Sequence, residues 1–116
     1  MRRGTTPTHE FATDTDISQA KEIFITYKQN SYTVIEKTKE DFDEITDKHI
    51  LLRLSQKDTL GFKPQTKITI QIRAVFNDGS AMASNIIETS VDDVLKEVKI
   101  WKMILLSMPF LMITNH

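Results

Sequence analysis

The stretch "TKITIQIRAVF" (residues 66–76) decides the fold class of this chain. Apolar side chains stand at every second position from Ile68 to Phe76, and mostly polar ones stand between them. This alternation predicts a half-buried β-strand, because successive side chains of a strand point to opposite faces. The next residues, "NDGS", contain an Asp-Gly pair that is typical of a hairpin turn, so residues 80–90 are predicted to be the return strand. Adjacent isoleucines within that return strand blur its alternation and favour a bulge near Ser84 and Asn85.

The segments before this hairpin show the same period of two. Residues 21–38 are predicted to form another hairpin, since Ile23, Ile25 and Tyr27 share one face and "QNS" supplies a turn. Shorter candidate strands are residues 8–12, 42–45 and 48–54. Together with the hairpin at residues 66–90, these segments space strands roughly 8–12 residues apart, as in all-β domains.

Two short helical segments are expected between and after the strands. Ser55 is followed three residues later by Asp58, which resembles a capping box, and Gly61 suits the end of a helical turn. Residues 55–60 are therefore predicted to be helical. Residues 90–98 are predicted to be helical too, because two aspartates stand near the start, at the positive end of a helix dipole.

About seven short strands with turns between them predict an all-β fold, an antiparallel Ig-like β-sandwich with one or two short helical turns. A small barrel is the alternative. The chain has 116 residues, enough for one domain. We assign residues 1–98 to the sandwich and residues 99–116 to an apolar C-terminal tail.

The tail contains an uncharged run over residues 103–113. As a helix this run would measure about 17 Å, against roughly 30 Å of membrane hydrocarbon, and Pro109 interrupts it. A membrane span is therefore disfavoured. An added strand or an apolar tail that faces a partner is favoured, and an altered or extended reading frame remains an alternative.

Composition narrows the function classes. A formal net charge of −1 argues against general nucleic-acid binding, which needs a basic excess. The absence of cysteine excludes disulfides and thiolate catalysis. Neither a glycine-rich phosphate loop nor a G-x-S-x-G motif occurs, so we expect a non-enzymatic protein with no cofactor and no small-molecule substrate. Arg2 and Arg3 precede a polar stretch with a proline, which does not match a secretory signal.

Few residue groups suggest chemistry. His9, His49 and His116 lack the spacing of metal ligands, and we expect His9 and His49 to face solvent on strands. The acidic residues 41–47 do not match a calcium loop, because Ile45 stands where a side-chain oxygen is needed and Thr46 where glycine is needed, which favours a solvated loop.

Aromatic residues indicate packing or contact. Tyr27 and Tyr32, like Phe24, are predicted to pack across strands. Exposure of these tyrosines and Trp101 along a groove would instead favour a carbohydrate- or surface-binding module. Candidate partner contacts are Arg2, Arg3, Trp101 and Phe110.

Four stretches carry a family resemblance: "MRRGTTPTHEF", "ITYKQNSYTVIEKT", "LSQKDTLGF" and "ITIQIRAVFNDGSAMASNIIETSVDDVL". With these, the chain resembles small uncharacterised proteins from the tail and baseplate region of tailed phages and prophages of Gram-positive bacteria. It is also loosely similar to the N-terminal β-sandwich of phage upper-baseplate proteins. The resemblance runs from Met1 to about Val98, and "WKMILLSMPFLMITNH" (residues 101–116) lies outside the pattern.

The resemblance implies a structural or assembly protein that acts through protein–protein contacts. Its expected partners are phage structural proteins or further copies of itself. Its expected location is the virion, or the host cytoplasm during assembly. A membrane-associated small protein that uses the apolar run is a further alternative.

Overall fold

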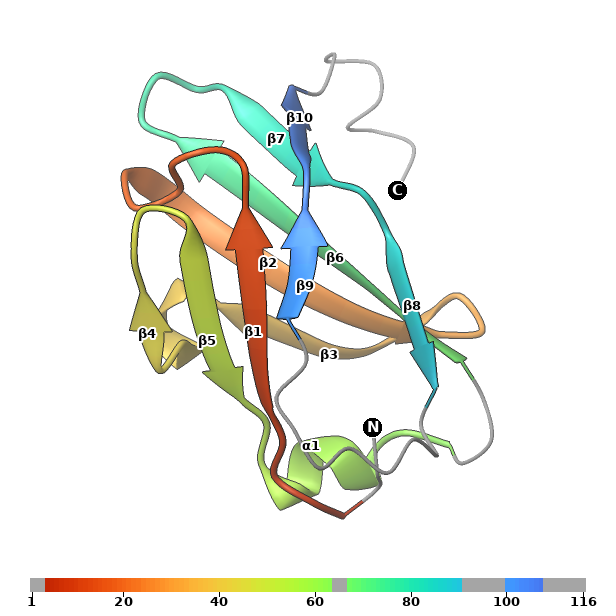
Figure 1. Ribbon diagram of the computed structural model, residues 1–116. Coiled ribbons are helices and arrows are strands. Elements are labelled where there is room, and N and C mark those ends of the chain that lie inside the picture. The colour runs from red at the N-terminus through yellow and green to blue at the C-terminus, as the bar shows by residue number, and fades with distance from the viewer. Residues whose placement is uncertain (1–3, 64–66, 91–99, 108–116) are drawn as a thin grey trace.

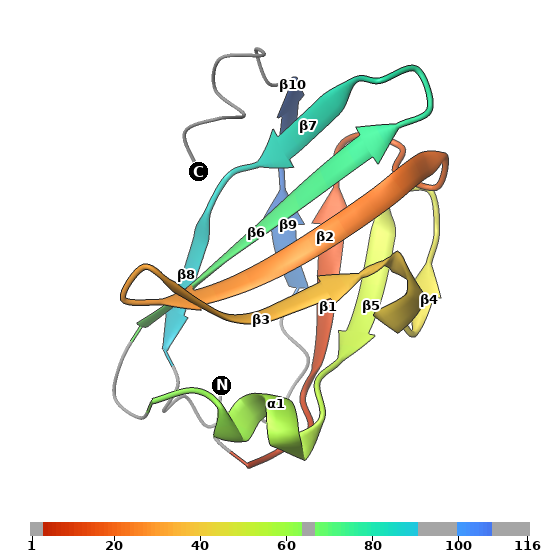
Figure 2. The same cartoon turned by 180° about the vertical axis from the view of Figure 1, so that it is seen from behind.

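The structure is a computed structural model that describes residues 4–63, 67–90 and 100–107; at residues 90, 100–102 and 107 it describes the backbone. These residues form two β-sheets that pack face to face, with one short α-helix, α1, across one end (Figure 1, and from behind in Figure 2). Sheet A has the strand order β4-β5-β1-β9. Sheet B has the order β10-β7-β6-β2-β3, and β8 also pairs with β6.

The strands and helices have the following bounds. Sheet A contains β1 (Thr8–Thr13), β4 (Glu44–Ile45), β5 (His49–Arg53) and β9 (Ile100–Met103). Sheet B contains β2 (Ala20–Gln29), β3 (Tyr32–Thr38), β6 (Lys67–Phe76), β7 (Ala81–Ser84), β8 (Ile87–Ser90) and β10 (Leu105–Ser107). The helical segments are α1 (Gln56–Leu60) and the 3₁₀ helix η1 (Lys39–Asp41).

The predicted all-β sandwich is confirmed, with ten strands in the described residues instead of about seven. Two sources supply the difference: the return strand splits into β7 and β8, and residues 100–107 form β9 and β10. Every strand pair is antiparallel except β1 with β9, which run parallel.

The core lies between the two sheets, where the alternating apolar residues meet. Fully buried side chains come from β2 and β6 in sheet B and from β1 and β5 in sheet A. They include Ile23, Ile25, Tyr27, Ile68, Ile70, Ile72, Phe11, Ile50 and Leu52. Burying each such side chain contributes about 1.5–3 kcal/mol, so this interior dominates the stability of the domain.

Turn residues account for both predicted hairpins. Asn30 and Ser31 join β2 to β3 with φ angles of 50° and 69°, a tight turn whose twist matches that of the strands. Gly79 lies between β6 and β7 with φ of 88°, a conformation in which other residues are strained. The bulge near Ser84 and Asn85 is also confirmed, because residues 84–86 oppose only residues 71–72 of β6.

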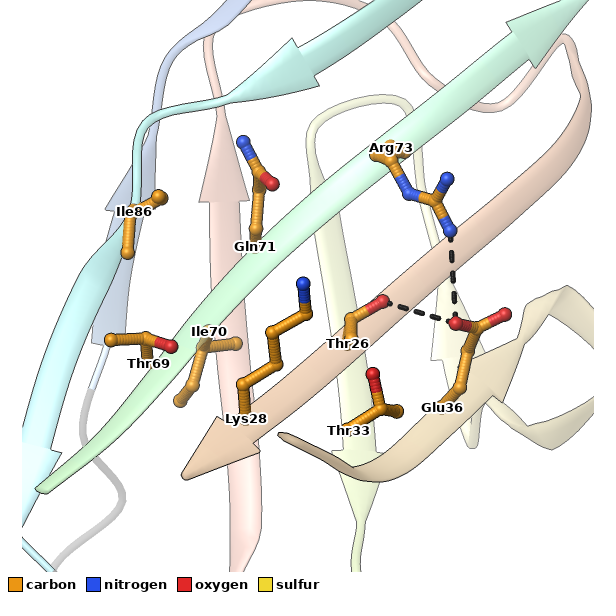
Figure 3. A pocket seen from close by; sticks show the side chains of 9 residues that line it. All are labelled: Thr26, Lys28, Thr33, Glu36, Thr69, Ile70, Gln71, Arg73 and Ile86. Carbon is orange, nitrogen blue, oxygen red and sulfur yellow. Dashed lines mark hydrogen bonds and ion pairs between the residues drawn. The ribbon is translucent and has the colours of Figure 1, made fainter. Parts of the chain in front are cut away.

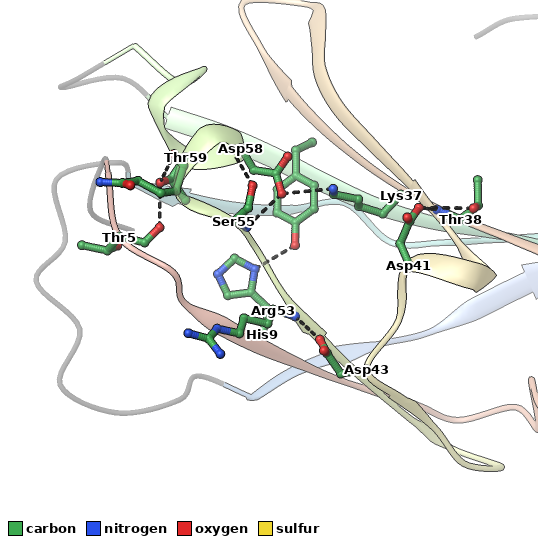
Figure 4. Close-up of polar contacts among 12 residues, drawn as sticks. Thr5, His9, Lys37, Thr38, Asp41, Asp43, Arg53, Ser55, Asp58 and Thr59 are labelled. Carbon is green, nitrogen blue, oxygen red and sulfur yellow. Dashed lines mark hydrogen bonds and ion pairs between the residues drawn. The ribbon is translucent and has the colours of Figure 1, made fainter.

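The predicted helical turn at residues 55–60 forms as α1. The Ser55 hydroxyl accepts a hydrogen bond from the Asp58 amide at 3.0 Å, and the Asp58 carboxylate accepts one from the Ser55 amide at 2.9 Å (Figure 4). This reciprocal pair is the capping box, and the helix ends at Gly61 as expected. The other predicted helix, residues 90–98, falls outside the described residues except for Ser90, which ends β8.

The C-terminal segment joins the two sheets. β9 pairs with β1 in sheet A, and after Ile104 the chain continues as β10, which pairs with β7 in sheet B (Figure 1). Met103 and Leu105 are buried in the core. Residues 100–107 are therefore added strands, one of the two forms expected of the apolar tail, and residues 108–116 lie outside the described part.

Candidate interaction surface

A groove crosses the outer face of sheet B. Its polar wall residues alternate with core residues on β2, β3 and β6, so the period of two that builds the core also places these residues on the opposite face. It encloses about 260 Å³. The lining residues are Thr26, Lys28, Thr33, Glu36, Thr69, Ile70, Gln71, Arg73 and Ile86 (Figure 3).

Most polar groups in the groove have a partner within it or beside it. The Arg73 guanidinium lies 3.7 Å from the Glu36 carboxylate and 5.2 Å from the centre of the Phe24 ring. The Thr26 hydroxyl donates to the same carboxylate at 3.4 Å (Figure 3). The side-chain amide of Gln71 donates to the Ser84 backbone carbonyl at 2.8 Å. These contacts fix the walls of the groove and neutralise the Glu36 charge.

Lys28 is the remaining charged residue of the groove. Within residues 4–63, 67–90 and 100–107 its ammonium forms no ion pair, and its side chain extends over the groove in Figure 3. Since Arg73 and Glu36 offset each other, the groove carries one net positive charge.

Three exposed aliphatic residues lie where β7, β8 and β10 meet, and we call them the apolar rim: Ile86, Ile104 and Leu106. Their exposed fractions are 60%, 52% and 64%. Asn85 links the two segments that carry the rim. Its backbone amide donates to the Ile104 carbonyl at 3.1 Å, and its side-chain oxygen accepts from the Ile104 backbone amide at 2.8 Å. Ile86 also lines the groove, so the rim and the groove form one continuous surface.

An acidic edge lies on another side of the molecule, over residues 39–47 with η1 and β4. Asp41 accepts from the Thr38 amide at 2.9 Å, and Asp43 accepts from the Arg53 amide (Figure 4). These carboxylates therefore serve as local caps, as expected of a solvated loop. Glu44 is exposed, and within the described residues its carboxylate has no hydrogen bond or ion pair.

The buried polar pair of the core is His9 with Tyr27. The Nδ1 atom of His9 and the Tyr27 hydroxyl are 2.7 Å apart and share a hydrogen bond, and both residues are shielded from solvent (Figure 4 shows His9). Burial lowers the pKa of His9 from 6.5 to about 4, so its ring is neutral at pH 7. Burial likewise raises the pKa of Tyr27 well above its usual value.

The prediction that His9 faces solvent is therefore wrong. His9 stands two positions before Phe11 in β1, so strand geometry points both side chains into the core. His9 and the apolar Phe11 are two positions apart in the sequence, and this spacing could have placed His9 on the core side of the strand. His49 is exposed as predicted, with half of its side chain accessible and its ring 3.8 Å from the Glu10 carboxylate.

The predicted contact residues are mostly outside the described part of the chain. This holds for Arg2, Arg3 and Phe110. Trp101 lies in β9, where its backbone pairs with that of Phe11.

The lead-in that follows the two arginines lies along the sandwich. The Thr59 hydroxyl donates to the Thr5 carbonyl at 2.7 Å (Figure 4), and the Leu54 amide donates to the Pro7 carbonyl at 2.9 Å. These contacts hold the segment against α1 and the end of β5.

In residues 4–63, 67–90 and 100–107 no three His, Asp or Glu residues come together as a metal site would require. No helix in the described part of the chain has the length and apolarity needed to cross a bilayer.

Comparison with known proteins shows the fold. No family model and no curated protein matches this chain. Among solved structures, a fimbrial assembly protein from Parabacteroides distasonis is similar, with a TM-score of 0.53 and 7% sequence identity. The match covers 89% of this chain and 53% of that one, so the chain spans about half the length of that protein. At this identity the likeness concerns the β-sandwich alone.

Proposed function

We propose that this chain is a non-enzymatic structural or assembly protein that acts through protein–protein contacts, in the tail or baseplate of a tailed phage. The observation that carries the proposal is the continuous surface of groove and apolar rim on sheet B. Clustered exposed aliphatic side chains beside polar groups are typical of protein contact sites. Covering the three rim residues would contribute about 1 kcal/mol each.

The face of sheet B suits a partner better than the edge at β3 does. Val34 is an extra residue in β3, since Tyr27 pairs with Ile35 while Lys28 pairs with Thr33, and such a bulge hinders strand addition. α1 lies beside the same edge, where the Lys37 ammonium is 3.0 Å from the Asp58 carboxylate. Addition of a partner strand at β3 is therefore disfavoured.

The edge at β10 is also a poor template for a partner strand. β10 has three residues, and the Leu105 amide already donates to the Asp14 carboxylate at 3.1 Å. We therefore propose contact across the groove and rim instead of β-augmentation.

Two further considerations support the proposal. The family resemblance covers residues from Met1 to about Val98, and it implies the phage setting and a place in the virion or in the host cytoplasm during assembly. A similar sandwich occurs in a fimbrial assembly protein, although that likeness concerns fold alone. The carbohydrate-binding alternative loses one of its three aromatic residues, because Tyr27 is fully buried.

Gene neighbourhood and virion proteomics test the proposal. We expect the gene to lie among tail and baseplate genes, and we expect peptides of this chain in purified virions if it is a structural component. An assembly factor would share the gene neighbourhood and be absent from virions. A gene among metabolic genes, with no tail gene nearby and no peptide in virions, would contradict the proposal.

A further inference from the structure

We propose that the groove and rim of sheet B receive the acidic edge of a second copy of this chain, with Lys28 of one copy paired to Glu44 of the next. The inference rests on the proposed function, because it names the partner of the same surface. It follows from the charges and the exposed apolar groups on the two surfaces.

The groove carries one unpaired positive charge, which one carboxylate would neutralise. Its Arg73 and Glu36 are already paired, and Lys28 is left with an ammonium that forms no ion pair among the described residues. Thr33 adds a hydroxyl group beside it, which can donate to a carboxylate oxygen. A carboxylate from outside would complete this arrangement through a charge-assisted hydrogen bond.

The acidic edge supplies that carboxylate and its surroundings. Residues 39–47 hold one lysine and five carboxylates, for a net charge of −4, whereas the groove carries +1. Glu44 is exposed and has no partner in the described part of the chain. The neighbouring Phe42 and Ile45 pack against the core of their own copy and are only partly buried, so their accessible surface can contact the rim residues Ile86 and Leu106.

The two surfaces lie on different sides of one molecule, so their contact cannot close into a symmetric pair. The groove is on the outer face of β2, β3 and β6, whereas the acidic edge includes β4, the outermost strand of sheet A (Figure 2). A contact between unlike surfaces repeats from copy to copy and builds an open string or a ring. The expected assembly is therefore a concentration-dependent series of oligomers.

Charge reversal tests the contact by sedimentation velocity over a concentration series at low salt. The wild-type chain should sediment faster as its concentration rises, and added salt should weaken this. Lys28→Glu and Glu44→Lys, each alone, should weaken association at least about tenfold, because like charges then face each other. Lys57→Glu is the matched control: it makes the same charge change on α1 and should associate as wild type does. Far-UV circular dichroism confirms that each variant is folded.

Mixing the two variants gives the decisive measurement. In an equimolar mixture of Lys28→Glu and Glu44→Lys, every contact between unlike variants is complementary, so association should return to the wild-type level. A mixture that stays monomeric, or a Lys28→Glu variant that associates as wild type does, overturns the inference. A wild-type chain that stays monomeric yet is found in purified virions overturns the self-contact and leaves the proposed function standing.

Discussion

Acidification should destabilise the folded protein through a single buried side chain, His9. Its ring lies in the core against Tyr27, and burial lowers its pKa from 6.5 to about 4. In the unfolded chain the ring binds a proton near pH 6.5, whereas in the folded protein it stays neutral until about pH 4. Because the unfolded state binds more protons in this window, the free energy of unfolding decreases as the pH falls from 6.5 toward 4.

The magnitude follows from the two pKa values. One pKa unit corresponds to about 1.4 kcal/mol, so the loss between neutral pH and pH 4 is about 3 kcal/mol. This is a large share of the total stability of about 5–15 kcal/mol typical of a small domain. At the centre of the window the slope should approach about 1.4 kcal/mol per pH unit.

The carboxyl groups with a lowered pKa lose their contribution to stability mainly at lower pH than His9 does. Three exposed carboxyl groups have a lowered pKa because neighbouring hydroxyls donate to them: Asp16 from Ser18, Glu40 from Thr38 and Asp78 from Ser80. A lowered carboxyl pKa adds stability above the ordinary value, and that stability is lost as the pH falls through the folded value. Their ordinary values are 3.8 for aspartate and 4.5 for glutamate, so this loss begins only at the acidic end of the His9 window.

Urea unfolding followed by circular dichroism between pH 4.5 and pH 7.5 measures the effect, with His9→Asn as the variant that cannot titrate. The wild-type curve should bend downward below pH 6.5, and the variant should lack this loss. His49→Asn is the matched control, because that histidine is half exposed, and it should keep the wild-type bend. Equal pH dependence in wild type and His9→Asn would refute the reasoning.

Two further predictions concern local backbone structure. Ser55→Ala removes the hydroxyl that caps α1 and should lower the free energy of unfolding by about 1 kcal/mol, whereas Gln56→Ala, one residue later, should change it by less than half of that. Gly79→Ala should lower it by about 1–2 kcal/mol, because φ at this position is 88° and no atom lies within 4 Å of the added carbon, so backbone strain alone acts. Urea unfolding at pH 7.5 measures both; a fully stable Gly79→Ala protein, or a Ser55→Ala protein that equals Gln56→Ala, would count against the respective argument.

Local sequence patterns predicted most individual elements. Alternation located β2 and β6, Asp-Gly located the turn at Gly79, and the Ser55–Asp58 spacing located α1. Each of these signals acts within a few residues, so it can be seen in the sequence alone.

Pairing between distant segments was not visible in the sequence. Alternation predicts that Lys28 and Arg73 leave the core side of their strands, but their shared groove depends on the register of β2 against β6. The apolar rim likewise forms because residue 104 meets residue 85. His9 was misassigned because a lone polar residue in a short strand gives little indication of its face unless the parity with Phe11 is used.

The parallel pairing of β1 with β9 sets an order for folding during synthesis. Glu10 pairs with Ile100, so the second side of β1 stays unpaired until residues 100–103 have left the ribosome. Until then β1 is an open edge that another nascent chain could join, and contacts between such distant segments also form slowly. A polypeptide released before residue 100 would therefore keep an unpaired edge at β1. Co-expression of the missing β9 strand as a peptide would be the direct way to cover that edge.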